Sequence, residues 1–201
     1  MIKKKFPAAF LDTEVASREH WNGENQYKCC GSDGILNKLK PYRPSDSYAM
    51  QLITMQDLYP GDSWSFCFGW ASFTEGVAAM SFCRYDPSWD GIEDEDREKN
   101  LLERGCAILC HEIGHQFGLR HCIYYECLMN GIMSAEEQRQ GGQRILCPVC
   151  SKKLKQNLKF DCTARYTALA KVCDEFGFDE QAAIYRKLLN DTKASGIVAK
   201  P

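Results

Sequence analysis

The stretch that decides the fold runs from residue 111 to residue 122 and reads HEIGHQFGLRHC. His111 and His115 stand four residues apart, about one helical turn, so both imidazoles project from one face of a helix. Gly118 tolerates the left-handed backbone that ends a helix sharply, so the chain can turn back after it. His121 follows three residues later. The spacing therefore predicts one zinc ion held by three imidazoles.

Glu112 lies at a different azimuth of the same helix. Three protein ligands leave a fourth position on zinc for a water molecule. Glu112 cannot easily bind the same ion, but it can reach that water and act as a general base and acid in peptide-bond hydrolysis. The alternative is a chance match of surface histidines. The fourth histidine, His20, lies far from the motif in sequence, and we interpret it as an ordinary surface residue.

A second metal site is predicted directly after the histidines. Cys147 and Cys150 are separated by two residues, and the nearest other close pair is Cys122 with Cys127. A shell of four thiolates suits zinc and leaves no open position, so this site would be structural. His121 is the neighbour of Cys122, so holding the cysteine should also help to hold the histidine. The alternative is four buried thiols with accidental spacing.

Composition limits the class of protein. The chain has 201 residues, a net charge of -2 and 12 cysteines, and its pI is about 6.1. Nothing suggests a nucleic-acid surface, and no run of 18 apolar residues predicts a membrane span. We expect a monomer in a reducing compartment, cytoplasmic or nuclear, because no signal peptide is evident. A disulfide-rich secreted domain is the alternative. Of the eight cysteines outside the predicted zinc site, Cys29 and Cys30 are adjacent, and the other six are interpreted as small buried hydrophobes: Cys67, Cys83, Cys106, Cys110, Cys162 and Cys173.

Hydrophobic patterns predict a mixture of strands and helices. Residues 1–30 show no clear period and are expected to form an irregular arm. Short strands are predicted at 48–55, 63–73 and 76–85, a helix ends near Lys40, and two or three helices occupy 151–192. The clearest element is a helix over about 95–117. One stripe of that helix is apolar and is expected to pack on the sheet, with the histidines on the opposite side toward a cleft; the stripe comprises Leu102, Cys106, Leu109, Ile113 and Phe117.

Residues 111–150 resemble the archaemetzincin family, in particular its animal members. The histidine motif continues directly into Cys122, then Cys127, then Met129, with seventeen residues before Cys147. The segments 53–60, 64–72 and 76–85 are also similar. The N-terminal region looks short beside animal members, and the family's first strand is not obvious within residues 1–30.

The resemblance implies a single metzincin-like domain over residues 1–201, of the α+β or α/β class. It implies a twisted mixed sheet, the zinc-binding helix, a structural-zinc region at 122–150 and C-terminal helices at 151–192. Met129 matches the methionine of the Met-turn, whose thioether packs beneath the imidazoles. Two zinc ions are implied, one catalytic and one structural on Cys122, Cys127, Cys147 and Cys150. Some metzincins carry a tyrosine where this chain has Gly131, so no tyrosine is assigned to catalysis.

The implied activity is that of a zinc metallopeptidase with a peptide or protein substrate as partner, and the finer expectation is aminopeptidase-like cleavage of small peptides. A zinc-stabilised interaction module with little catalysis is the main alternative. The short N-terminus favours that alternative, whereas the intact Glu112 argues against it. A redox or metal-sensing protein would need exposed, activated thiols, and no residue pattern marks them.

Overall fold

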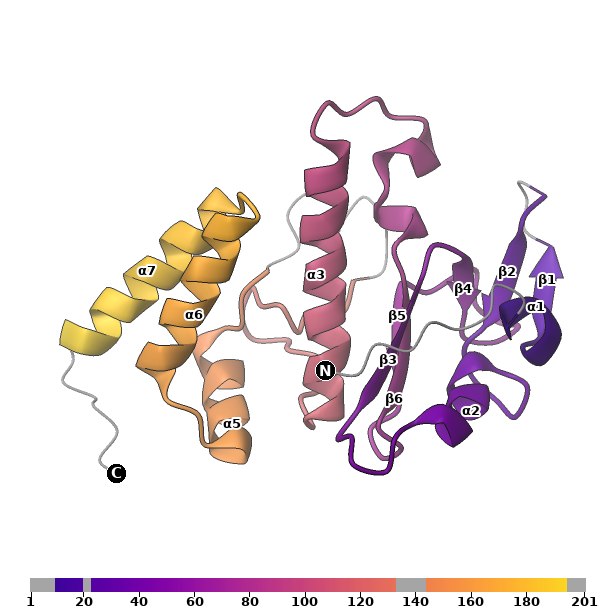
Figure 1. Cartoon of the computed structure of the whole chain (residues 1–201), viewed down its shortest axis with the longest axis horizontal. Helices are drawn as coiled ribbons and strands as arrows, with labels where there is room; N and C mark the ends of the chain where they lie inside the picture. Colours follow the sequence, from indigo (N-terminus) through magenta and orange to yellow (C-terminus); the bar gives the residue numbers. More distant parts are fainter. Residues whose placement is uncertain (1–9, 20–22, 133–143, 195–201) are drawn as a thin grey trace. The chain divides into compact units, whose positions relative to one another are not determined.

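The computed structural model describes residues 10–19, 23–132 and 144–194. Two compact units divide the chain, the first over residues 1–118 and the second over residues 119–201. All named strands lie in the first unit, together with the long helix α3, whereas the second unit carries helices and loops (Figure 1). Both sheets and their helices make this a mixed α/β fold, in agreement with the predicted class.

The first sheet lies near the start of the chain. Its strands are β1 (Ser17–Glu19), β2 (Asn25–Lys28) and β4 (Asp57–Tyr59), in the order β1-β2-β4. β2 pairs antiparallel with β1 and parallel with β4. A short helix α1 (Phe10–Glu14) precedes the sheet. The expected irregular arm was therefore wrong for the described part of residues 1–30, because strands of three or four residues are too short to show alternation and depend on partners distant in sequence.

The second sheet is also mixed and consists of β3 (Met50–Thr54), β5 (Gly69–Ala71) and β6 (Val77–Ser81). Their order is β3-β6-β5, with β3 parallel and β5 antiparallel to β6. All five residues of β6 are buried, since side chains pack on both faces of this central strand. The strand predicted at 48–55 is confirmed as β3, whereas the one predicted at 76–85 ends at Ser81 and its last residues form a 3-10 turn instead. The one predicted at 63–73 shrinks to three residues, and two small sheets replace the single sheet expected.

One hydrophobic cluster joins the two sheets to α2 (Ile35–Leu39), which continues into the 3-10 turn η1 (Lys40–Tyr42). The predicted end of a helix near Lys40 is confirmed. Residues distant in sequence meet in this cluster, so it fixes the strands against each other. Its buried members are Phe10, Val15, Tyr27, Cys29, Ile35, Leu36, Leu39, Leu52, Leu58, Val77 and Ala79.

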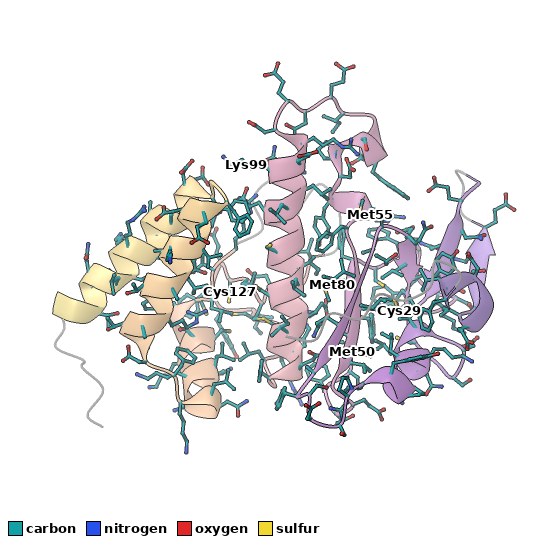
Figure 2. All side chains as sticks on the ribbon, viewed as in Figure 1. Cys29, Met50, Met55, Met80, Lys99 and Cys127 are labelled. Atoms are coloured by element: carbon teal, nitrogen blue, oxygen red, sulfur yellow. The ribbon has the colours of Figure 1, made fainter. Side chains whose placement is uncertain are left out.

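The other face of the second sheet packs on α3 (Arg97–Gln116), which follows the 3-10 turns η2 (Cys83–Tyr85) and η3 (Pro87–Asp90). Met80 of β6, labelled in Figure 2, packs against Ile108 and Leu109 of the helix. A Cβ on Gly105 would stand 2.4 Å from the ring of Phe82, so glycine permits this close approach. The helix predicted over 95–117 is confirmed.

The predicted orientation of α3 needs correction. Leu102, which begins the apolar stripe, is 38% exposed, and the other stripe members are only partly buried. The side chains of α3 that are buried include both histidines and Glu112. The stripe is therefore only part of the face that packs on the sheet: Leu109 packs there, while Gly105 approaches Phe82 and Glu112 approaches Gly69.

The second unit contains α5 (Pro148–Leu158), α6 (Cys162–Glu175) and α7 (Asp179–Ala194). Asp161 caps α6 by accepting a hydrogen bond from the backbone N–H of Ala164. α6 and α7 lie side by side (Figure 1) and share a core of Ala170, Cys173, Phe178, Ala182 and Tyr185. These elements agree with the helices predicted over 151–192. None of the helices in the described ranges is long and apolar enough to cross a membrane.

Candidate metal centres and active site

His111 and His115 lie one turn apart near the end of α3, as their spacing predicts. Their ring centroids are 4.6 Å apart with the planes nearly perpendicular, and each side chain is 8% exposed. The ring of Phe73 lies 5.3 Å from that of His115, so an aromatic side chain shields one side of this imidazole. Two adjacent, nearly buried imidazoles on one helix suit a zinc ion, which takes nitrogen ligands at about 2.0–2.1 Å.

Glu112 is buried against β5. It is 4% exposed, and burial raises the pKa of its carboxyl to about 8, because desolvation disfavours the carboxylate. A Cβ placed on Gly69 would stand 2.8 Å from Oε1 of Glu112. Gly69 therefore provides the space that the carboxyl group occupies. A bound cation nearby would favour the ionised form, and a carboxyl group balanced between its two forms is suited to transfer a proton near neutral pH.

The four predicted cysteines of the second unit converge. Cys122, Cys127, Cys147 and Cys150 are all buried, and their sulfur atoms lie within 4.8 Å of one another. The Cys122 and Cys147 sulfurs are 3.9 Å apart. Zinc–sulfur bonds of about 2.3 Å at tetrahedral angles would separate the sulfurs by about 3.8 Å. The donor set and its spacing therefore fit a closed zinc site.

Backbone N–H groups point at these sulfurs. Cys127 Sγ accepts from the N–H of Met129 at 3.4 Å and of Cys147 at 3.2 Å, and Cys147 Sγ accepts from the N–H of Cys150 at 3.4 Å. At Cys122, desolvation opposes ionisation, but backbone N–H groups of Tyr124 and Tyr125 outweigh it and lower the pKa to about 7. Donors of this kind stabilise thiolates, which are the form that binds metal.

His121 begins the same segment of the second unit. Its side chain is exposed, and it packs against the backbone of Gly131, where a Cβ would stand 3.0 Å from Nδ1. Gly131 stands where some metzincins carry a tyrosine. In this chain it leaves room for the imidazole of His121. Met129 is fully buried in one cluster with the four cysteines and Leu119.

Asn130 holds the loop between the first two cysteines. Its Nδ2 donates to the carbonyls of Cys122 at 2.6 Å and Tyr125 at 2.9 Å, and its Oδ1 accepts from the N–H of Cys127 at 2.7 Å. The N–H of Cys122 donates to the carbonyl of Met129 at 2.8 Å. One side-chain amide thus replaces a regular hydrogen-bond ladder. The sequence analysis missed this residue.

Comparison with known proteins identifies the family. Residues 34–156, more than half of the chain, match the family described as peptidase family M54. The chain belongs to peptidase family M54. Archaemetzincin-2 of Pongo abelii is 38% identical over 205 residues, an alignment that covers 90% of this chain and 56% of that protein. This M54 chain spans about half the length of the curated relatives it matches.

Two solved structures resemble this M54 chain. A zinc-dependent peptidase from Methanocorpusculum labreanum is 29% identical with a TM-score of 0.53, covering 60% of this chain and 71% of that one. An archaemetzincin from Methanopyrus kandleri is 31% identical with a TM-score of 0.52, covering 63% and 64% respectively. The archaemetzincin resemblance that the motifs indicated is thus confirmed.

Among the described residues, β5 is one of the two edge strands of the second sheet in this M54 chain. Ser81 donates its backbone N–H to the carbonyl of Phe68 at 2.8 Å, and Ser72 donates to Val77 at 2.9 Å. With Gly69 paired to Met80, this register turns the backbone groups of Phe68, Trp70 and Ser72 toward β6. The N–H and C=O groups of Gly69 and Ala71 therefore point away from β6, toward the open edge.

One residue near the buried carboxyl of Glu112, Tyr85, also escaped sequence reasoning. Tyr85 is almost completely buried, and its hydroxyl has no hydrogen-bond partner among the described residues. Burial first, and the charge of Glu112 second, raise the pKa of this phenol well above its usual value. His20 lies outside the described residues. Of the six cysteines predicted to be buried, Cys83 and Cys173 are buried, Cys67, Cys106 and Cys162 are partly buried, and Cys110 is exposed.

Proposed function

We propose that this M54 chain is a zinc-dependent metallopeptidase. His111, His115 and His121 would hold the catalytic zinc, and Glu112 would be the general base. The observation that supports this most is the buried carboxyl of Glu112, for which Gly69 leaves space directly beside two histidines. A protein that used its zinc only for stability would not need a desolvated carboxyl at that position.

A zinc ion in this site, when bound, polarises a carbonyl group and makes a water molecule a stronger nucleophile at neutral pH. Glu112 then removes a proton from the attacking water and returns it to the nitrogen of the departing amine. Because the carboxyl group of Glu112 is buried, bulk water does not solvate it. Phe73 excludes water from one side of His115 and limits the positions that its ring can take.

The substrate would bind as an extended peptide along β5. Gly69 and Ala71 offer backbone donors and acceptors at the open edge, and such pairing gives affinity with little sequence selectivity. Side chains would add the selectivity. Trp64 and Trp70 are 46% and 36% exposed, and their rings pack edge to face with centroids 6.3 Å apart. By strand alternation Trp70 lies on the face opposite Gly69, so we expect preference for a large apolar residue on that side of the peptide.

The second zinc would be structural, held by Cys122, Cys127, Cys147 and Cys150, and two ions per chain are expected. Met129 would be the Met-turn residue. Its burial beside the cysteines supports a packing role, because a thioether enclosed by carbon and sulfur atoms stiffens the loop that carries His121. Aminopeptidase-like cleavage of small peptides is the finer proposal for specificity.

The test is cleavage of a mixed peptide pool by the zinc-loaded chain beside its Glu112→Gln variant, with zinc measured in both. The variant keeps the size of the side chain but removes the base. Zinc should remain bound while cleavage falls by about two to four orders of magnitude. Equal cleavage by both proteins would refute the mechanism. Zinc binding without cleavage by either protein would favour the interaction module.

A further inference from the structure

Two thiols that belong to neither metal set lie next to each other in the first unit. The sulfur atoms of Cys29 and Cys67 are 3.5 Å apart, although the residues are 38 positions apart in sequence. Cys29 is fully buried in the hydrophobic cluster that joins the two sheets, and Cys67 is partly buried against it. In Figure 2 the labelled Cys29 lies in the part of the first unit that carries β2 and α2.

Both thiols are held by backbone bonds to the same strand, β4. The N–H of Cys29 donates to the carbonyl of Tyr59 at 2.7 Å, and the N–H of Cys67 donates to the carbonyl of Leu58 at 2.8 Å. Leu58 and Cys67 also form an antiparallel bridge. The carbonyls of Leu58 and Tyr59 point to opposite sides of β4, so Cys29 and Cys67 flank this strand and their sulfurs meet across it.

The segment before Cys67 is anchored as well. Arg18 donates to the carbonyls of Trp64 at 2.7 Å and Ser65 at 2.9 Å, and Gln26 donates to the Ser65 carbonyl at 2.8 Å. Chain segments that approach Cys67 from both directions are thus fixed. The pair is preorganised, rather than being two mobile side chains that happen to meet.

We propose that Cys29 and Cys67 form a peroxide-sensitive thiol pair that closes to a reversible disulfide. A disulfide needs a sulfur–sulfur distance of about 2.05 Å, so the two sulfurs must approach by only about 1.5 Å. Because the two cysteines flank β4, closing the bond also requires their backbones to approach each other, since a disulfide holds the two Cα atoms about 4.4–6.8 Å apart. The reactant that this pair takes is hydrogen peroxide or another small hydroperoxide.

The chemistry balances with one peroxide for each pair. The Cys67 thiol gives up its proton and its sulfur attacks one peroxide oxygen; the O–O bond breaks, and the departing hydroxide takes up that proton and leaves as water. Cys67 is then a sulfenic acid. The Cys29 sulfur loses its proton and attacks Cys67 Sγ; the S–S bond forms, the S–O bond breaks, and a second water leaves. Two thiols lose two electrons in total, and one hydrogen peroxide becomes two waters.

The order of these steps follows from exposure. Cys67 is the more accessible thiol, so peroxide reaches it first. The hydrogen bond with Cys67, followed by burial, holds the pKa of Cys29 well above its usual value, which keeps Cys29 protonated until its partner has been oxidised. Cys30 is the competing thiol, because it is partly buried against the same cluster.

The test treats the full-length, zinc-loaded chain with one equivalent of hydrogen peroxide. Free thiols are then alkylated, the chain is digested, and cross-linked peptides are identified by mass spectrometry, with zinc content measured in parallel. The expected product joins Cys29 to Cys67, forms with zinc unchanged and disappears on treatment with dithiothreitol. The melting temperature should rise by roughly 5–15 °C in the oxidised form, since the bond closes a long loop.

Variants separate this pair from general thiol oxidation. Cys67→Ala should abolish the cross-link and the rise in melting temperature, and Cys29→Ala should leave Cys67 as a sulfenic acid that a dimedone probe traps. Cys162→Ala, at a partly buried thiol of the second unit, should change neither the cross-link nor the rise in melting temperature. A cross-link from Cys67 to Cys30, or oxidation of the four clustered cysteines while Cys67 remains reduced, would overturn the proposal. These readouts do not depend on peptidase activity.

Discussion

A Cβ on Gly69 would stand 2.8 Å from Oε1 of Glu112 and 3.0 Å from its Cδ and Cγ atoms, so the carboxyl group fits only because this strand residue has no side chain. Glycine weakens a strand, since it contributes no packing and loses more entropy on folding. Because Gly69 has no side chain, the buried Glu112 of α3 can approach this edge strand of the sheet. The first prediction follows directly from this contact.

Gly69→Ala should displace the carboxyl of Glu112 without removing it. Three atoms of that side chain crowd the new methyl group, and Glu112 is itself buried, so it cannot move away freely. We expect kcat for peptide cleavage to fall by roughly one to two orders of magnitude with zinc retained, since a misplacement of 1 Å can cost about 10²-fold. Gly61→Ala is the matched control, because nothing lies within 4 Å of its Cβ position. Unchanged kcat in Gly69→Ala would contradict the contact.

Gly131→Ala should weaken the hold on His121. The added Cβ would stand 3.0 Å from Nδ1 and 3.2 Å from Cε1 of that imidazole. Because His121 is exposed, its ring can swing outward, and the catalytic zinc would lose a ligand. Elemental analysis should show zinc falling from two toward one per chain, while the four cysteines stay protected from alkylation. Two zinc ions and normal cleavage in this variant would show that the crowding is harmless.

The two predicted metals should differ in what they stabilise. Cys150→Ser removes a ligand from a closed, buried site, and structural zinc binding is worth about 10–16 kcal/mol in small metal-folded peptides. We expect a large loss of melting temperature. His115→Ala removes a ligand from an open site on a helix that packs independently on the sheet, so cleavage should vanish with a smaller thermal effect. Equal destabilisation by both variants would remove the distinction between catalytic and structural zinc.

Proline substitutions test which backbone groups face the substrate. Trp70→Pro should unfold or strongly destabilise the first unit, because the Trp70 N–H is turned toward β6. Ala71→Pro removes an N–H at the open edge instead, so the fold should persist while KM for peptides rises. Circular dichroism and peptide kinetics on the zinc-loaded proteins distinguish the two results. The register thus excludes Phe68 and Trp70 as substrate-facing donors.

Tyr85→Phe should leave stability unchanged or raise it by about 1 kcal/mol, because it deletes a buried hydroxyl without a partner among the described residues. Tyr27→Phe is the matched comparison, since the Tyr27 hydroxyl donates to Asp12. It should cost about 1 kcal/mol. Denaturant unfolding of both variants measures the difference. If Tyr85→Phe were the more damaging change, its hydroxyl would have a partner that the structure does not show.

Sequence reasoning predicted the arrangement best where residues are close together in the chain. The separation of His111 from His115 specifies one helix face, and Cys147 and Cys150 lie on a single helical start, so their proximity could be predicted from spacing alone, while their binding of zinc stays a proposal. The long helix and the buried strand β6 were also predictable. Each carries enough residues for its hydrophobic composition to be visible.

Features created by tertiary contacts could not be predicted. The sequence around Gly69 suggests only a bulge or a close approach, and nothing in it names Glu112 as the neighbour. β2 and β4 are too short to show a period, and their pairing joins Tyr27 to Leu58 across the first unit. The face of α3 was misjudged because hydrophobic periodicity assumes that polar residues seek water. A functional residue such as Glu112 can be polar and still be buried, because its role requires a position away from bulk water.

The amide of Asn130 has a chemical consequence beyond holding its loop. The residue is followed by Gly131, and an asparagine before a glycine is the arrangement in which side-chain amides hydrolyse most readily to carboxylates over time. Aspartate has no donor to replace Nδ2, so a negative oxygen would face the carbonyls of Cys122 and Tyr125. Repulsion between these oxygen atoms would then destabilise the loop. We expect the Asn130 amide to be protected from hydrolysis in the folded, zinc-bound chain and to be hydrolysed faster in the zinc-free chain. Peptide mapping after prolonged storage would measure the difference.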